Sequence, residues 1–333
     1  MAEIAVIGAG SWGTALSLTL FRLGHAVKMW AYEEEVVEVI RRNRENSIFL
    51  PGVNLPEGIY PTTSLTEALE DSRFVLTAVP SHVCRDLYRR MLPFLHPGMT
   101  FVSATKGLEV DSLMRMSEVI REVVSARFEP RLVVLSGPSF AREVARGDPT
   151  AVVAASQDAE SAREVQTRFS SRAMRLYTSG DVAGVELGGA VKNVIAIAAG
   201  VIEGLGLGHN PMAALITRGL AEMTRLACAC GGKRETLAGL AGMGDLVLTC
   251  TGGLSRNRSV GIELGKGRKL PEILASMNTV AEGVKTTGAT VALARKHGVD
   301  MPITEHVWMI LQDKISPRDA IRELMDRALK DET

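Results

Sequence analysis

The fold is decided near the N-terminus by the stretch Glu3-Ile-Ala-Val-Ile-Gly-Ala-Gly-Ser-Trp-Gly13. Its first six residues predict an apolar strand, and apolar residues at helical spacing follow over Thr14–Leu23. A second strand is predicted at Ala26–Trp30, so strand, helix and strand succeed one another within about 30 residues. The glycines fall at the turn between the first strand and the helix. This is the arrangement of a βαβ unit.

The alternation of strand and helix continues through the first half of the chain. Further apolar runs predict strands at Phe74–Val79, Thr100–Ala104, Arg131–Leu135 and Thr150–Ala154. Near-continuous hydrophobic strands separated by helices predict a parallel sheet covered on both faces. From about Gly180 the strand-like runs give way to helical patterns, such as 185–205 and 211–229. We therefore predict an α/β fold: a doubly wound Rossmann domain at residues 1–180 and an all-helical domain at 181–333.

The composition is that of a globular protein with no excess of either charge. Hydrophobic residues make up 46% of the 333-residue chain, and 38 Lys and Arg balance 38 Asp and Glu. With no net field to attract polyanions, we expect no nucleic-acid partner and no attraction to an anionic membrane. The cysteines lack the spacing of a metal site, so no metal is expected; they are Cys84, Cys228, Cys230 and Cys250.

Targeting signals are not expected either. The chain begins with a strand pattern and carries no basic and apolar leader. Its most apolar stretch, Val194–Ile202, is shorter than the ~20 residues that cross a bilayer. We expect a buried helix there, no membrane span and a cytoplasmic protein.

The turn Gly8–Gly13 matches the pattern GxGxxG in an informative context, because it follows a strand and opens a helix. The three glycines allow a tight turn, close approach of the backbone to a pyrophosphate, and close packing of helix on strand. The helix N-terminus offers free N–H groups to the phosphates. The alternative is an ordinary strand-to-helix turn, but the context favours binding of a nicotinamide dinucleotide by Gly8, Gly10 and Gly13.

The residues after the second strand bear on the choice between NAD and NADP. Tyr32-Glu33-Glu34-Glu35 stands where an acidic residue holds the ribose of NAD, or an arginine accommodates the 2′-phosphate of NADP. The nearest basic residues, Arg41 and Arg42, fall further along the next predicted helix. The carboxylates favour NADH; the alternative is that they form only the solvated start of a helix.

Two of the predicted strands are followed by residues suited to a ligand. Lys106 follows the strand Thr100–Ala104, and the small residues of Ser136-Gly-Pro-Ser-Phe-Ala141 follow the strand Arg131–Leu135. Ligands of open α/β sheets bind at the carboxyl ends of the strands. Lys106 is therefore a candidate ligand-binding residue, with a surface lysine in a turn as the alternative.

Lys192 is the most informative single residue, because the predicted helix around it, Leu187–Ala199, is otherwise apolar on nearly every face. A lysine is rarely buried without a partner or a task. Partial desolvation brings the pKa of its amine toward the range where it gives and takes protons. The alternative is a lysine whose amine reaches the surface between two domains.

A candidate anion site follows at Ser255-Arg-Asn-Arg-Ser259. Ser255 predicts the N-cap of a helix, and two arginines at a helix N-terminus suit a phosphate. Asp245, ten residues earlier, would repel phosphate, so we expect it to orient a hydroxyl or a lysine. The alternative for the basic segment is a helix cap on the surface.

Six segments in a fixed order resemble the bacterial-type NAD(P)-dependent glycerol-3-phosphate dehydrogenases. They are GAGSWGTAL, ATKGLE, SGPSFAREVA, VKNVIAIAAG, AGMGDLVLTCTGGLSRNRSVG and VAEGVKT. The resemblance implies reduction of dihydroxyacetone phosphate to sn-glycerol 3-phosphate, a phospholipid precursor. It also implies a Rossmann domain followed by a helical domain like that of 6-phosphogluconate dehydrogenase. One position departs from the family, whose members often carry Arg or His where this chain has Tyr32-Glu33.

The resemblance implies roles for individual residues as well. Lys192 is then the proton donor or acceptor. The implied substrate contacts, with Arg256 and Asn257 near the phosphate, are Lys106, Gly137, Ser139, Lys192, Asp245, Ser255, Arg256 and Asn257. The implied cofactor contacts are Gly8, Gly10, Ser11, Trp12, Gly13, Tyr32, Glu33, Lys106, Ala141, Arg256, Val280 and Glu282. Because an apolar helical domain of this kind often dimerises, a homodimer is expected.

Two other functions fit parts of the sequence. A dehydrogenase of the same architecture acting on a 3-hydroxy acid or a sugar acid would meet a carboxylate, whereas the paired arginines with Asp245 suit a phosphomonoester and a hydroxyl. A non-catalytic dinucleotide sensor would need neither a lysine in an apolar helix nor a phosphate site. The sequence favours the phosphorylated substrate.

Overall fold

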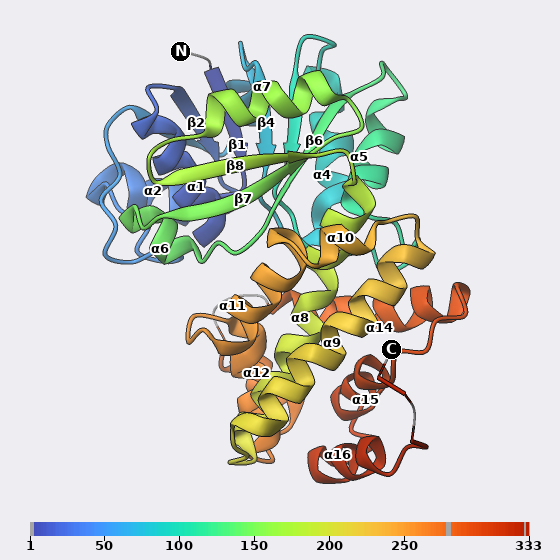
Figure 1. Cartoon of the computed structure of the whole chain (residues 1–333). Coiled ribbons are helices and arrows are strands. Elements are labelled where there is room, and N and C mark those ends of the chain that lie inside the picture. The colour runs from blue at the N-terminus through green and yellow to red at the C-terminus, as the bar shows by residue number, and fades with distance from the viewer. Residues whose placement is uncertain (1–2, 278–280, 330, 333) are drawn as a thin grey trace.

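The computed structural model describes residues 3–277, 281–329 and 331–332, which fall into two parts. The sheet half, residues 3–180, lies at the top of Figure 1, and the helical half, residues 181–332, lies below it. The sheet has the strand order β3-β2-β1-β4-β5-β6-β7-β8. Its strands are β1 Glu3–Ile7, β2 Ala26–Trp30, β3 Ile59–Thr62, β4 Phe74–Thr77, β5 Thr100–Ser103, β6 Arg131–Ser136, β7 Thr150–Ala155 and β8 Met174–Ser179.

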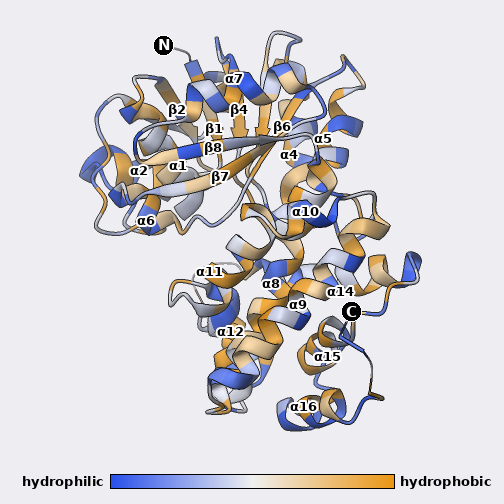
Figure 2. Cartoon of the chain, viewed as in Figure 1, coloured by the Kyte–Doolittle hydropathy of each residue, from blue (hydrophilic) through white to orange (hydrophobic). Residues whose placement is uncertain are grey.

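Helices cover both faces of this sheet. They are α1 Ser11–Arg22, α2 Glu34–Asn43, α3 Leu65–Leu69, α4 Cys84–Met91, α5 Met116–Val124, α6 Ala141–Arg146 and α7 Ala159–Phe169, with short 3₁₀ turns at Ser81–Val83 and Leu92–Phe94. Apolar side chains of α1, α2, α6 and α7 form one core layer, and those of α3, α4 and α5 form the other. Figure 2 shows hydrophobic colour on the central strands and hydrophilic patches on outer helices such as α7. The doubly wound architecture is confirmed.

The prediction of an all-parallel sheet is wrong at one pair of strands. Strands β6 and β7 are antiparallel, with Leu135 opposite Ala154, whereas the other neighbouring strands pair in parallel. A parallel return requires a crossover connection that runs back along the length of the strands. The length of helix α6, which has six residues, does not account for the reversal, because α3, with five residues, connects β3 to β4 and these two strands run in the same direction. An apolar run predicts a buried strand but does not encode its direction.

Two edge strands were missed by the sequence analysis. Strand β3 is four residues long and contains Pro61, a residue that sheets accept mainly at their edges. Strand β8 alternates buried and exposed residues at its start and pairs with β7. Neither segment has the continuous apolar run by which the interior strands were recognised.

The helical half is built around one long central helix, α8 Val182–Gly204, which descends from the sheet in Figure 1. Its other described elements are α9 His209–Ala229, α10 Arg234–Leu237, a π-helical turn at Leu240–Gly244, α11 Asp245–Thr251, α12 Arg256–Gly265, α13 Leu270–Ala275, α14 Glu282–Lys296, α15 Pro302–Leu311 and α16 Pro317–Met325. Asp181 caps α8 by accepting a hydrogen bond from the backbone N–H of Gly184.

Helix α8 is long and apolar enough to cross a membrane, but its apolar window is wholly buried inside the structure. One set of its side chains packs with α9, α11 and α14, and another set packs with α12 and α15. This agrees with the expectation of a buried helix around Val194–Ile202. Its first turn also reaches β6, because Val185 shares a small core with Val134, Val153 and Ala241.

Candidate active site

The glycine-rich turn joins the end of β1 to the start of α1, and its three glycines differ in what surrounds them. Gly8 has a φ of 116°, and a Cβ there would lie 2.5 Å from the carbonyl oxygen of Ala78. A Cβ on Gly13 would lie 1.8 Å from the carbonyl oxygen of Gly8. These two glycines are required by the fold itself. A Cβ on Gly10 would meet nothing within 4 Å, so this position borders open space.

The other residues of the turn offer hydrogen-bond donors at the same place. The Ser11 hydroxyl donates to the carbonyl oxygen of Phe49, 2.7 Å away, which leaves the backbone N–H groups of the first α1 turn for a ligand. Within the described residues, the buried indole N–H of Trp12 has no hydrogen-bond partner. Open space beside Gly10 and uncapped donors at a helix N-terminus fit the pyrophosphate of a dinucleotide.

Tyr32 and Glu33 lie exposed after β2, and Tyr32 is 73% exposed. Glu33 is the N-cap residue of α2, whose first turn adds Glu34 and Glu35. Arg41 donates a hydrogen bond to the carbonyl oxygen of Pro61 and lies over the ring of Tyr60. This end of β2 is therefore acidic, and Arg41 is engaged with β3.

Three charged residues that are far apart in sequence meet at the carboxyl edge of the sheet. Asp245, the first residue of α11, accepts a hydrogen bond from Lys106 Nζ at its Oδ2, 2.6 Å away, and one from Lys192 Nζ at its Oδ1, 2.7 Å away. Lys106 follows β5, and Lys192 lies in the middle of α8. One carboxylate thus holds both lysines, where the sequence predicted that Asp245 orients a hydroxyl or a lysine.

Neighbouring oxygens complete this cluster. Lys106 also donates to the carbonyl oxygen of Gly137, 2.9 Å away, and the Ser139 hydroxyl donates to the same oxygen. Lys192 also donates to the hydroxyl oxygen of Thr249, 2.7 Å away. Thr249 was missed by the sequence analysis, although it stands four residues after Asp245 and therefore on the same face of α11.

Burial and charge shift the pKa values in this cluster. Lys192 is 7% exposed, and burial lowers the pKa of its amine to about 8, with Lys106 acting in the same direction and Asp245 in opposition. Burial alone would raise the pKa of Asp245, but the two lysines hold it below its ordinary value. With a pKa of about 8, the ammonium form of Lys192 can donate a proton and its neutral amine can accept one in a catalytic cycle.

The N-terminus of α12 lies in the helical half, as do Lys192 and Asp245, and it differs in part from the predicted anion site. Ser255 caps the helix, as predicted, by accepting from the backbone N–H of Arg258. Arg258 is ion-paired with Glu203 of α8, so the expectation of two arginines for one anion is wrong for this residue. Arg256 is exposed. Asn257 donates to the side-chain oxygen of Asn193, the residue after Lys192, and accepts from the backbone N–H of Gly283.

The remaining predicted residues lie around these groups. Glu282, at the start of α14, accepts from the hydroxyl of Ser81 just after β4, 2.9 Å away, and so joins the helical half to the sheet half. Ala141 is the first residue of α6, which packs against α1. Val280 lies outside the described residues.

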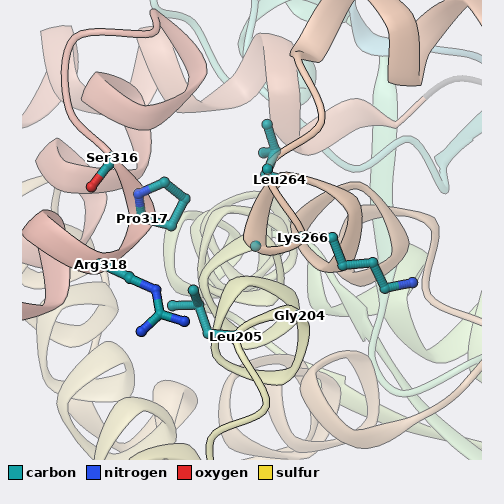
Figure 3. Close-up of a pocket in the computed structure, with 9 residues that line it drawn as sticks. Gly204, Leu205, Leu264, Lys266, Ser316, Pro317 and Arg318 are labelled. Carbon is teal, nitrogen blue, oxygen red and sulfur yellow. The ribbon is translucent and has the colours of Figure 1, made fainter.

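A pocket of about 450 Å³ lies elsewhere, at the far end of α8, and Figure 3 shows Arg318 beside Leu205 in it. Its lining residues come from the ends of α8 and α12 and the start of α16, and none belongs to the predicted site. It begins twelve residues beyond Lys192, or about 18 Å along the helix. The candidate active site is instead the lysine cluster of Lys106, Lys192 and Asp245, because that is where the charged groups converge.

Comparisons with known proteins decide the family. The NAD-dependent glycerol-3-phosphate dehydrogenase N-terminus matches residues 3–162, and the corresponding C-terminus matches residues 181–322. The chain belongs to the NAD-dependent glycerol-3-phosphate dehydrogenase family. The resemblance drawn from the sequence is thereby confirmed, and so is the dependence on a nicotinamide dinucleotide, NAD(H) or NADP(H).

Individual members of this family are similar over the whole length. The glycerol-3-phosphate dehydrogenase of Koribacter versatilis, named for NAD(P)+, is 62% identical over 98% of both chains. That of Citrifermentans bemidjiense is 56% identical over 100% of this chain and 99% of its own. The solved structure of the Coxiella burnetii glycerol-3-phosphate dehydrogenase is 41% identical, with a TM-score of 0.94 over 98% of this chain and 99% of that one.

Proposed function

We propose that this protein reduces dihydroxyacetone phosphate to sn-glycerol 3-phosphate, with Lys192 as the proton donor. The observation that carries the proposal is the contact of the buried Lys192 and the partly buried Lys106 with the single carboxylate of Asp245 at the carboxyl edge of the sheet. Family membership supports the same reaction.

The cofactor would be held by the turn after β1. Gly8, Gly10, Gly13, Ser11 and Trp12 would bind its pyrophosphate, through backbone N–H groups at the start of α1. Tyr32 and Glu33 would lie near the ribose of its adenosine, and their acidic surroundings favour NADH. Further contacts are proposed for Lys106, Ala141, Arg256, Val280 and Glu282. The nicotinamide supplies the hydride that the substrate carbonyl carbon receives.

Lys192 would act on the oxygen of that carbonyl. Negative charge grows on this oxygen as the carbonyl is reduced, and the ammonium of Lys192 stabilises the charge and then delivers the proton. Asp245 keeps the amine charged and fixes its position. In the direction of oxidation, the neutral amine of Lys192 would take the proton from the substrate hydroxyl.

The rest of the substrate would be held by residues around the cluster. Lys106 and Asp245 would hold its hydroxymethyl end, and Gly137 and Ser139 would lie at the junction of substrate and cofactor. Ser255, Arg256 and Asn257 would contact the substrate as well, with Arg256 and Asn257 near its phosphate. A phosphate fixed at the start of α12 holds the carbonyl in register with the reacting groups. Arg258 is engaged with Glu203, and the family resemblance supports Arg256 as the cation of this site.

The wider setting is proposed from the same grounds. We infer that the product enters glycerophospholipid synthesis, that the protein works in the cytoplasm, and that it forms a homodimer. We also propose residues 1–180 as the dinucleotide-binding domain and residues 181–333 as the substrate and catalytic domain.

The variant Lys192→Ala tests the proposal. We expect turnover of dihydroxyacetone phosphate, followed by NADH absorbance, to fall by about 10²- to 10⁴-fold, because a general acid of this kind contributes that factor. The variant should still bind NADH, because the residues of the pyrophosphate turn are unchanged.

A variant that keeps a normal rate would remove Lys192 from the mechanism. If the wild-type protein instead reduces carbonyl substrates that carry a carboxylate, the result would favour a hydroxy-acid dehydrogenase. Binding of NADH without turnover would favour a sensor. Repeating the assay with NADPH tests the cofactor preference, and a strong preference for NADPH would overturn the role given to Tyr32 and Glu33.

A further inference from the structure

A second buried charge lies on the same helix as Lys192, and the mechanism above gives it no role. Glu186 is in the second turn of α8 and is 7% exposed. Burial raises the pKa of its carboxyl, and nearby Arg115 acts in the opposite direction. A buried carboxylate is costly unless strong hydrogen bonds compensate for the lost water. The carboxylate of Glu186 in this apolar helix therefore needs hydrogen-bond donors from other parts of the protein.

The partners of Glu186 all belong to the sheet half. Its Oε1 accepts from the backbone N–H of Ser117, 2.8 Å away, and its Oε2 accepts from the Ser117 hydroxyl and from Arg115 Nη1, 3.3 Å away. Ser117 is the second residue of α5, so the carboxylate also lies at the positive end of that helix. These bonds fasten the catalytic helix of one half to a helix of the other.

The segment that leads from β5 to α5 is also bound to the helical half at a second point. The segment between β5 and α5 carries Lys106, which Asp245 holds, near its start and Arg115, which Glu186 holds, at its end. Between them, Leu108 and Leu113 pack into the core of the helical half. The connection that carries Lys106 is therefore bound to the helical half at several points.

We propose that Glu186 is a positioning residue that sets the place of Lys192 relative to Lys106 and the carboxyl edge of the sheet. Six residues separate Glu186 from Lys192, which is about 9 Å along a continuous helix. A helix fixed at Glu186 cannot slide or turn on the sheet, so the amine of Lys192 stays beside Asp245. The inference rests on the catalytic role proposed for Lys192.

The variant Glu186→Gln in the full chain tests this role. Its amide keeps the size of the side chain, but it replaces one acceptor oxygen by a donor that faces the Ser117 hydroxyl and Arg115. We expect kcat for dihydroxyacetone phosphate to fall by about 10- to 100-fold, as small misplacements of reacting groups do. The deuterium isotope effect with NADH labelled at the transferred hydrogen should rise, because chemistry then limits turnover. Affinity for NADH should not change.

Glu222→Gln is the matched control. Glu222 is another buried carboxylate, and it accepts from the backbone N–H groups of Ile303 and Thr304 and from the Thr304 hydroxyl at the start of α15. It joins two helices of the helical half and contacts nothing in the lysine cluster. Its kcat and isotope effect should equal those of the wild type, whatever happens to the melting temperature.

Equal kcat and equal isotope effects in the two variants would overturn the positioning role. Should Glu186→Gln fail to fold, Ser117→Ala removes only the hydroxyl donor and should give a smaller loss of kcat with a raised isotope effect. An unchanged isotope effect in Ser117→Ala would then count against the proposal. If Lys192→Ala loses turnover while Glu186→Gln and Ser117→Ala have no effect, the positioning role alone is refuted and the proposed reaction stays intact.

Discussion

Asp245 is the residue on which the proposed chemistry depends most directly. Its two oxygens each hold one ammonium, so the cluster of Lys106, Lys192 and Asp245 carries one net positive charge inside the protein. Such a cluster suits an oxygen on which negative charge develops. Lys192 was singled out from the sequence because of its apolar surroundings. That one carboxylate serves both lysines depends on contacts across 139 and 53 residues, which no local pattern reveals.

The lowered pKa of Lys192 predicts the pH dependence of turnover. Below about 8 the amine is protonated and can donate, so kcat for reduction should be constant there and fall as the pH rises above about 8. For oxidation of sn-glycerol 3-phosphate, kcat should instead rise through the same value. Asp245 raises the pKa of Lys192, so the residual activity of Asp245→Asn should show its break at lower pH. A break that stays in place would contradict this assignment.

The packing of α8 against α12 is the clearest feature at the level of elements. The two helices approach closely because glycines face each other: a Cβ on Gly200 would lie 2.0 Å from the carbonyl oxygen of Arg258, and one on Gly261 would lie 2.0 Å from that of Ile197. This close approach brings Asn257 within reach of Asn193. The glycines therefore set the distance between the helix that carries Lys192 and the helix whose N-terminus is the proposed phosphate site.

We predict that Gly261→Ala destabilises the protein. The added methyl group must push α12 away from α8, and such overpacking costs about 1–3 kcal/mol, only partly offset by the higher helix propensity of alanine. Urea unfolding should therefore show a loss on the order of 2 kcal/mol in the free energy of unfolding. Gly180→Ala is the control, because a Cβ there meets nothing within 4 Å. A stability equal to that of the control would show that α8 and α12 separate at no cost.

The whole molecule is held together by contacts between its two halves as well as within them. Val134 and Val153 of the sheet share a core with Val185 and Ala241 of the helical half. Glu186 and Glu282 add hydrogen bonds between the halves at Ser117 and Ser81. These contacts bury apolar surface and charge together. Unfolding of one half would therefore leave polar and apolar groups of the other half without partners.

We therefore expect the two halves to unfold together. In Trp308→Phe the remaining tryptophans, Trp12 and Trp30, report on the sheet half, while far-ultraviolet circular dichroism is dominated by the helical half. The two signals should give one midpoint in urea, and NADH, although bound mainly by the sheet half, should raise both midpoints by mass action. Two separate midpoints, or a shift in the fluorescence signal alone, would contradict this expectation.

Much of the architecture was determined locally by the sequence. Apolar runs identified the interior strands, the glycines of Gly8–Gly13 identified the turn, and Ser255 identified the start of α12, because each depends on neighbours within a few residues. The resemblance of six segments identified the family. The edge strands β3 and β8 and the antiparallel direction of β7 were missed, because edge strands need little apolar surface and an apolar run does not encode strand direction.

The tertiary structure alone decided how the charged residues pair. Asp245 could be expected to orient a lysine, but only the fold places both lysines on it, adds Thr249, and takes Arg258 away to Glu203. It also places Glu186 at the start of α5. The reason is physical: burial and apolar periodicity are written in local sequence, whereas an ion pair forms between side chains that only the packing of distant elements brings within about 3 Å.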